Sequence, residues 1–152
     1  MGAEIERKFL VDPAWRPKDE GTYFKQGYLS SVKERVVRVR IAGPKAKLTI
    51  KGVTTGVSRA EYEYEIPLAD AKELLDLCEQ PLIEKRRHLE IVGGKQFEID
   101  VFLGANAGLV IAELELAAED EAFERPPWLG AEVSGDERYY NNNLIAHPFT
   151  TW

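Results

Sequence analysis

The chain has 152 residues and a formal net charge of -6 at pH 7, with 44% hydrophobic and 30% charged residues. These values are ordinary for a folded globular protein, so they argue against a disordered chain and against a membrane protein. The negative charge also argues against nonspecific nucleic-acid binding, which depends on an excess of basic residues, but it leaves room for a local basic site.

Residues 1–152 are enough for one domain whose core buries about two-thirds of the surface that the unfolded chain exposes. Cys78 is the only cysteine, so no internal disulfide can form and a reducing compartment is compatible. The sequence has no basic region followed by an apolar run, and no stretch approaching the roughly 20 apolar residues of a membrane span. We therefore expect a single cytoplasmic domain with no membrane partner and no nucleic-acid partner.

Alternation of apolar and polar residues with a period of two predicts that most of the chain forms short β-strands. The connectors Gly43-Pro44 and Gly93-Gly94 are short and rich in residues that tolerate turn geometry, which favours antiparallel neighbours. Eight strands are expected, at residues 3–11, 22–30, 35–42, 46–52, 58–66, 82–91, 96–103 and 109–117.

Two helices are expected among these strands. Apolar residues at helical spacing predict one over residues 68–78, which would cover apolar sheet surface. A second is predicted over residues 137–146, with Asp136 as its N-cap. Residues 119–130 are expected to form an irregular link.

The first strand carries two acids and a base at alternate positions. Glu4, Glu6 and Lys8 are spaced i, i+2, i+4, which places all three side chains on one face of a strand. Ile5 and Phe9 point to the other face and can be buried. Two carboxylates beside an ammonium group on one strand face suggest a metal ion together with an anion.

The same alternation of charged and apolar residues recurs in the later strands. The usual interpretation is a solvated outer face of a sheet that is packed on one side. Two observations argue against a simple solvated face. These positions are nearly all charged rather than Ser, Thr, Gln or Asn, and most strands carry mainly acidic or mainly basic side chains. The charged positions are Arg38 and Arg40, Lys51, Arg59, Glu61 and Glu63, Lys85 and Arg87, Asp100, and Glu113 and Glu115.

Closing the eight strands around these residues would turn the charged face inward. The predicted fold is therefore an α+β protein dominated by β-structure: a closed eight-stranded antiparallel β-barrel with a charged interior and a few covering helices. Charges in such an interior are tolerable only if they are paired or bound to a ligand. Carboxylates can bind Mg²⁺ or Mn²⁺ while Arg and Lys bind phosphate oxygens, so the interior suits a metal with a polyphosphate.

The run Glu4-Ile5-Glu6-Arg7-Lys8 resembles the ExExK signature of the CYTH or triphosphate tunnel metalloenzyme family. The family includes inorganic triphosphatases, thiamine triphosphatases and class IV adenylate cyclases. The resemblance implies a closed eight-stranded tunnel that binds a triphosphate group with a divalent metal, Mg²⁺ or Mn²⁺. It extends over nearly the whole chain, in order through Gln26-Gly27-Tyr28-Leu29, Val37-Arg38-Val39-Arg40, Leu48-Thr49-Ile50-Lys51-Gly52, residues 59–66, Lys85-Arg86-Arg87, Asp100-Val101-Phe102, Gly108-Leu109, Ala112-Glu113-Leu114-Glu115-Leu116 and residues 132–143.

The resemblance also implies roles for individual residues. Glu61 and Glu63 would orient the bases or a water, Lys85 is a catalytic candidate, and Tyr28 is either a proton-transfer residue or ordinary cross-strand packing. The main metal ligands would be Glu4, Glu6 and Glu115, with Glu113 and Asp100 as helpers or ligands of a second metal. The phosphate-binding bases would be Lys8, Arg38, Arg40, Lys51, Arg59, Lys85 and Arg87.

The expected reaction is metal-dependent hydrolysis of inorganic tripolyphosphate to pyrophosphate and phosphate, because the sequence is most similar to short bacterial inorganic triphosphatases. A class IV adenylate cyclase acting on ATP and a thiamine triphosphatase are alternatives within the family. A noncatalytic polyphosphate-binding module is the alternative from another class, although it has less need of the acids. In each case the partner is a small anionic substrate, and a homodimer is left open.

Overall fold

The structure, a computed structural model, describes residues 2–152 except 4, 56–57 and 119. Two α-helices are present in these residues, α1 (Leu68–Asp76) and α2 (Asn141–Ala146), with short 3-10 helices η1 (Gly104–Asn106), η2 (Glu137–Tyr139) and η3 (Phe149–Thr151). The strands are β1 (Gly2–Ala3), β2 (Ile5–Val11), β3 (Thr22–Ser30), β4 (Arg35–Ala42), β5 (Lys45–Thr55), β6 (Ser58–Ile66), β7 (Ile83–Val92), β8 (Lys95–Phe102), β9 (Val110–Leu116) and β10 (Leu129–Glu132).

The described strands form one antiparallel sheet in the order β1-β6-β5-β4-β3-β7-β8-β9-β2-β10. The eight predicted strands are confirmed within a few residues, except that the first is divided into β1 and β2. Gly43 and Gly93 turn the β4–β5 and β7–β8 hairpins with positive φ values of 59° and 58°, a conformation that costs other residues steric strain.

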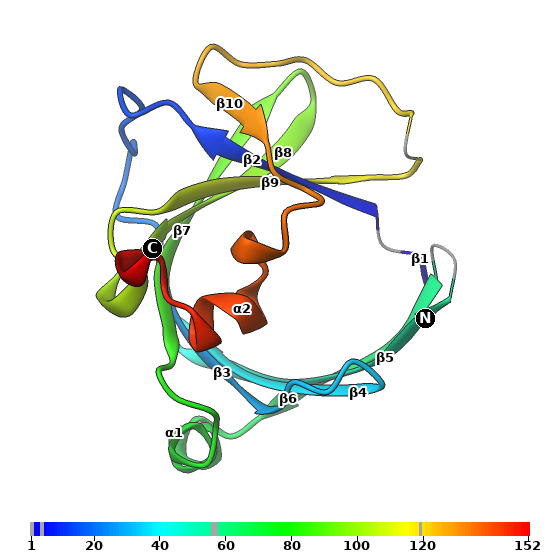
Figure 1. The fold of residues 1–152 in the computed structure, drawn as a ribbon, viewed down its shortest axis with the longest axis vertical. Helices are drawn as coiled ribbons and strands as arrows, with labels where there is room; N and C mark the ends of the chain where they lie inside the picture. Colours follow the sequence, from blue (N-terminus) through cyan, green and yellow to red (C-terminus); the bar gives the residue numbers. More distant parts are fainter. Residues whose placement is uncertain (1, 4, 56–57, 119) are drawn as a thin grey trace.

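The prediction of a closed barrel is wrong, because the sheet stays open. Figure 1 shows the sheet curling through most of a turn, with its opening between β1 and the start of β2. β1 pairs with β6 at one edge of the sheet, whereas β2 pairs with β9 near the other. The second edge of β2 is taken by β10, through Leu129 opposite Val11 and Glu132 opposite Phe9. Around Phe9 both edges of β2 are therefore occupied, and this part of the strand cannot pair with β6 to close a barrel.

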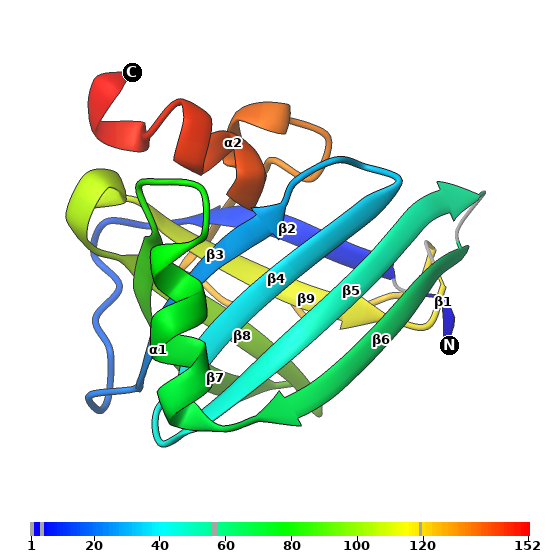
Figure 2. The ribbon, with the colours of Figure 1, turned by 90° about the horizontal axis from the view of Figure 1, so that it is seen from below.

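The apolar outer face of the sheet is covered in two places. Helix α1 packs Ala71 and Leu75 against Val39 and Ala46, and Figure 2 shows it lying across the outside of the sheet. The segment after β9 covers the second place, over β2, β8 and β9. There Trp128 packs against a cluster of buried side chains that includes Phe97 and Leu114. The role predicted for the first helix is thereby confirmed.

The second predicted helix forms differently from the expectation. Residues 137–146 divide into η2 and α2, with Asp136 accepting a hydrogen bond from the backbone N–H of Arg138 as the N-cap of η2. This segment packs Tyr139 and Leu144 at the end of the sheet rather than over the outer face, as Figure 2 shows for α2.

The prediction of an irregular link over residues 119–130 is wrong at its C-terminal end, because β10 begins at Leu129. Arg7 projects from β2 on the outer side, as its alternation with Glu6 requires, and donates to both carboxylate oxygens of Glu132, at 2.9 Å from Nε and 2.5 Å from Nη2. Ser134 donates a third hydrogen bond to the same carboxylate. These bonds tie β10 to β2 across 125 residues of sequence.

No helix among the residues described here is long and apolar enough to cross a membrane. The single domain, the cytoplasmic location and the homodimer stay predictions.

The Arg7–Glu132 pair gives a prediction about stability. The hydrogen bond from Arg7, followed by the one from Ser134, lowers the pKa of Glu132 from 4.5 to about 2. A lowered folded-state pKa means that the stabilisation is present above pH 4.5 and is lost as the pH falls toward 2. We expect Glu132→Gln to lower the free energy of unfolding at pH 7 by about 1 kcal/mol or less, because the pair is partly exposed.

Urea denaturation of the wild type and Glu132→Gln across this pH range measures the effect. Glu65→Gln is the matched control, since its carboxylate lies 3.7 Å from Lys45 in a much more exposed pair and should contribute less. A difference between wild type and Glu132→Gln that did not shrink on acidification would contradict the assignment.

Candidate active site

Most of the charged side chains predicted to face inward line a cavity of about 1020 Å³ on the concave side of the sheet. Tyr140 and Asn141–Asn143, around the start of α2, line the same cavity. Lys85 and Asp100 do not reach its wall, and Glu4 lies outside the described residues. The predicted residues brought together on the wall are Glu6, Lys8, Tyr28, Arg38, Arg40, Lys51, Arg59, Glu61, Glu63, Arg87, Glu113 and Glu115.

Three carboxylates converge on one side of this cavity. Glu6, Glu98 and Glu113 each offer an oxygen atom, and these oxygens lie within 4.8 Å of one another. Their strands are neighbours: β9 pairs with both β2 and β8, and Glu98 stands directly opposite Glu113. Glu115 lines the cavity but is not part of this cluster.

The electrostatics of the cluster fit a divalent cation. Burial, followed by the charges of Glu113 and Asp100, raises the pKa of Glu98 against the opposing effect of Arg87. Burial also acts to raise the pKa of Glu113, but the charges of Lys8 and Lys85 outweigh it and lower that pKa. Carboxylates held together against their repulsion, with only oxygen donors, match the ligand preference of Mg²⁺ or Mn²⁺.

Glu98 is the residue of this cluster that the sequence analysis missed. The signal was present, because Glu98 precedes Asp100 by two residues and alternates with the buried Phe97 and Ile99. The same i, i+2 rule that identified the acids of β2 and β9 therefore extends to β8.

The basic residues stand mainly on the opposite strands, β4 to β6. Arg38 donates from Nη2 to Thr49 Oγ1 at 3.4 Å, and Thr49 donates to Glu63 at 3.1 Å. Burial would raise the pKa of Glu63, but hydrogen bonds from Lys47 and Thr49 outweigh it and lower that pKa. Glu63 thus remains charged and fixes Thr49 beside Arg38, consistent with its predicted role of orienting the bases.

Two further bases lie on this wall. Arg59 donates from Nε to the backbone oxygen of Gly52 at 2.7 Å, which fixes the guanidinium near the end of β5. Lys8, on β2, lies 3.8 Å from Glu113 and 5.6 Å from the ring centre of Tyr140. Lys8 therefore connects the acidic side of the cavity with the segment that precedes α2.

Below the cavity wall, Asp100 holds two bases. Its side chain is 1% exposed and accepts from Lys85 Nζ at 2.7 Å, and from Arg87 Nε and Nη2 at 2.8 and 2.9 Å. Burial alone would raise the pKa of Asp100, yet the two cations depress it well below its usual range. Burial lowers the pKa of Lys85 to about 8, against the opposing effect of Asp100. Both oxygens of Asp100 are thus engaged, and its role as a metal ligand stays a prediction.

Tyr28 is predicted to be either a proton-transfer residue or a cross-strand packing residue, and its position has features of both. It lies on the cavity wall opposite Arg38 in the β3–β4 pairing. It is also 8% exposed and belongs to a core cluster with Ile83 and Tyr139. Cross-strand packing is therefore observed, and proton transfer stays a prediction.

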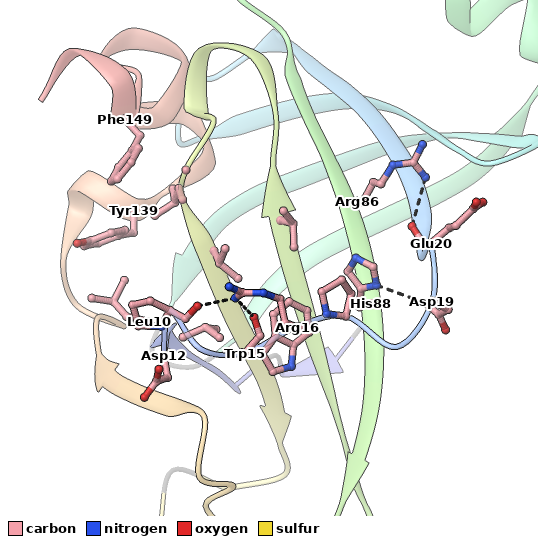
Figure 3. Close-up of a pocket in the computed structure, with 17 residues that line it drawn as sticks. Leu10, Asp12, Trp15, Arg16, Asp19, Glu20, Arg86, His88, Tyr139 and Phe149 are labelled. Carbon is pink, nitrogen blue, oxygen red and sulfur yellow. Dashed lines mark hydrogen bonds and ion pairs between the residues drawn. The ribbon is translucent and has the colours of Figure 1, made fainter.

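A second cavity, of about 900 Å³, lies on the outer side of β7, β8 and β9 (Figure 3). Its wall is largely apolar, and its rim mixes Arg16 and Arg86 with Asp12, Asp19 and Glu20. Figure 3 shows Arg86 reaching the backbone of Glu20 and His88 reaching Asp19, so the polar groups bond mainly to the loop that forms the rim. The inner cavity, where the carboxylate cluster and the cations converge, is the candidate active site.

Comparisons with known proteins agree over nearly the whole chain. An inorganic triphosphatase from Acetivibrio thermocellus is 50% identical over 151 residues, covering 98% of this chain and 97% of that protein. An inorganic triphosphatase from Nitrosomonas europaea is 37% identical over 145 residues, covering 93% and 95%. A crystal structure of an inorganic triphosphatase superposes with a TM-score of 0.71 at 36% identity, covering 95% of each chain. The CYTH domain profile matches residues 2–147, and the chain therefore belongs to the CYTH domain family.

Proposed function

We propose that this protein hydrolyses inorganic tripolyphosphate to pyrophosphate and phosphate with Mg²⁺ or Mn²⁺. The observation that carries the proposal is the inner cavity, in which a three-carboxylate cluster faces a wall of guanidinium and ammonium groups. The relatives at 50% and 37% identity are both inorganic triphosphatases, which supports hydrolysis of an inorganic triphosphate by this chain.

The basic wall suits a chain of phosphates. Guanidinium groups form bidentate hydrogen bonds with phosphate oxygens, and several cations in one cavity attract a multiply charged anion strongly. Asp100 keeps Arg87 aimed at the cavity from below, and Thr49 with Glu63 does the same for Arg38. The proposed phosphate-binding residues are Lys8, Arg38, Arg40, Lys51, Arg59 and Arg87, with Lys85 beneath them.

The metal would be held by Glu6, Glu98 and Glu113, with Glu115 nearby on the wall. Glu4 belongs to the same proposal through its spacing from Glu6. A bound divalent cation would supply Lewis acidity toward the phosphate oxygens and neutralise charge there. Positioning and charge neutralisation are most of what phosphoryl transfer requires from a protein.

Proton transfer has two candidate residues, Lys85 beneath the cavity wall and Tyr28 on it. Lys85 has a pKa of about 8, close enough to neutrality for its Nζ to exchange a proton with a neighbouring group. Tyr28 lies on the cavity wall and is the second candidate. We propose that Tyr28 on the wall and Lys85 beneath it, rather than the exposed histidine His147, serve proton transfer for the cavity.

Incubation of the purified protein with tripolyphosphate, ATP and thiamine triphosphate in turn tests the proposed reaction. With Mg²⁺ or Mn²⁺ we expect tripolyphosphate to give equal amounts of phosphate and pyrophosphate, and EDTA to stop the reaction. Cyclic AMP as the main product from ATP would favour a cyclase, and faster turnover of thiamine triphosphate would favour that substrate. Tight tripolyphosphate binding without phosphate release would favour a binding module instead.

The carboxylate cluster gives a prediction about metal binding. Glu98→Gln and Glu6→Gln remove one negative ligand each, so each should weaken Mn²⁺ binding by about tenfold or more and lower kcat while the fold is retained. Titration calorimetry with Mn²⁺ measures the affinity. Glu73→Gln, on the exposed side of α1, is the matched control and should bind Mn²⁺ like the wild type. Wild-type Mn²⁺ affinity in Glu98→Gln would remove Glu98 from the cluster.

The basic wall gives a prediction about substrate affinity. Arg38→Ala should raise KM for tripolyphosphate by about 10- to 100-fold, since a hydrogen bond to a charged group contributes about 1.5 to 3 kcal/mol. Steady-state kinetics measure this, with Arg35→Ala as the control because Arg35 is exposed on the same strand and lies outside the cavity lining. Equal KM values in the two variants would show that Arg38 does not bind the substrate.

A further inference from the structure

Phe24 is an apolar residue among the cations of the inner cavity. On β3 it shares a face with Gln26 and Tyr28, and it stands opposite Lys85 on β7 and Ala42 on β4. Its side chain is 8% exposed. Packing between strands would account for a buried ring here, but it does not account for what surrounds the ring.

Three cations surround the ring of Phe24. The guanidinium carbon of Arg87 lies 4.7 Å from the ring centre, that of Arg40 lies 5.0 Å away, and Lys85 Nζ lies 5.9 Å away. All three distances are within the range at which the negative face of an aromatic ring attracts a cation, and the attraction is stronger where water is excluded. The ring is therefore shared by two bases of the cavity wall and the lysine beneath it.

The two guanidinium groups differ in what else holds them. Arg87 is fixed by Asp100 and by Glu98, at 2.8 Å. Arg40 donates from Nε to Gln26 Oε1 at 2.7 Å, and it forms no ion pair within the part of the chain that the structure describes. Burial, then the charges of Arg38 and Arg87, lowers the pKa of Arg40 to about 9, with Asp100 and Tyr28 opposing them. Arg40 therefore depends on Gln26 and on the Phe24 ring for its position.

A ring suits this position better than a carboxylate would. A carboxylate could hold both guanidinium groups, but its charge would repel a phosphate and its oxygens would compete for the same N–H donors. An aromatic ring attracts the cations without a net charge and itself occupies none of their N–H donors. The bases can then be held close together before any anion neutralises their repulsion.

We propose that Phe24 is a positioning residue of the anion site, whose ring, together with Gln26, holds the guanidinium group of Arg40 in place beside Arg87 for a polyphosphate. The proposal rests on the proposed function, in that these two bases bind the triphosphate. Phe24 acts through them and does not itself need to contact the substrate.

Tripolyphosphate binding in EDTA, measured by titration calorimetry, tests this role without turnover. Phe24→Leu keeps an apolar side chain and removes the ring, so we expect Kd to rise about 5- to 20-fold, and KM in metal to rise more than kcat falls. Phe24→Tyr keeps the ring and should stay within about twofold of the wild type. Phe24→Met, which fills a similar volume, provides the same test if the leucine variant folds poorly.

Phe97→Leu is the matched control for the loss of a buried ring. Phe97 is fully buried among Phe123 and Trp128 and has no cation over its ring among the described residues. Phe97→Leu should lower the unfolding temperature as Phe24→Leu does, yet retain wild-type affinity for tripolyphosphate. A general structural effect would change the affinity of both variants, and that result would overturn the proposal.

Two further outcomes separate this proposal from the proposed function. If the wild type binds tripolyphosphate and Phe24→Leu binds it equally well, the positioning role is wrong and the function stands. If the wild type neither binds tripolyphosphate in EDTA nor hydrolyses it with Mg²⁺ or Mn²⁺, the proposed function is wrong, and NMR of the arginine Nε–Hε groups still tests the ring. Phe24→Leu should shift the Arg40 and Arg87 signals by removing the ring current, and unchanged signals would overturn the proposal.

Discussion

The ion pairs of Asp100 with Lys85 and Arg87 are the interaction on which the inner cavity depends. The Asp100 and Lys85 side chains are each 1% exposed, so neither charge is stabilised by bulk water. Removing one partner of such a group leaves a buried charge uncompensated, which is strongly destabilising. Because Arg87 stands directly opposite Asp100 in the β7–β8 pairing, the register of one hairpin sets where this base lies in the cavity.

The two sides of the cavity follow from the order of the strands. Neighbouring strands β2, β9 and β8 bring the three carboxylates together, while β4, β5 and β6 carry most of the bases. A polyphosphate with a divalent cation has the complementary distribution, with negative oxygens on one side and a metal on the other. Separation of the signs by strand, rather than the net charge of -6, is therefore the property that matters for function.

The strands and the inward face could be predicted from sequence because their signal is local. Alternation with a period of two marks each strand and decides which side chains share a face, and it placed residues such as Arg38, Arg87 and Glu113 on the cavity wall. Glu98 carries the same signal, since it alternates with the buried Phe97 and Ile99. Phe24 had no such signal, because its contacts with Arg40 and Arg87 come from strands on either side of it.

What the sequence could not predict depends on contacts between distant segments. The sheet is not closed, and β10 takes the edge of β2 at Phe9–Val11. Strand β10 has only four residues and forms by pairing rather than by a pattern of its own. The position of α2 beside the cavity likewise depends on Tyr139 and Leu144 packing against the sheet end. Apolar residues at helical spacing predict that a helix forms, but they do not predict the surface against which it packs.

A crystal structure with Mn²⁺ and a nonhydrolysable tripolyphosphate analogue tests the central claim most directly, because the anomalous signal locates the metal. The account predicts Mn²⁺ among the carboxylates of Glu6, Glu98 and Glu113, with the phosphates against Arg38, Arg40 and Arg87. Metal bound away from these acids, or an analogue seated in the outer cavity of Figure 3, would contradict it.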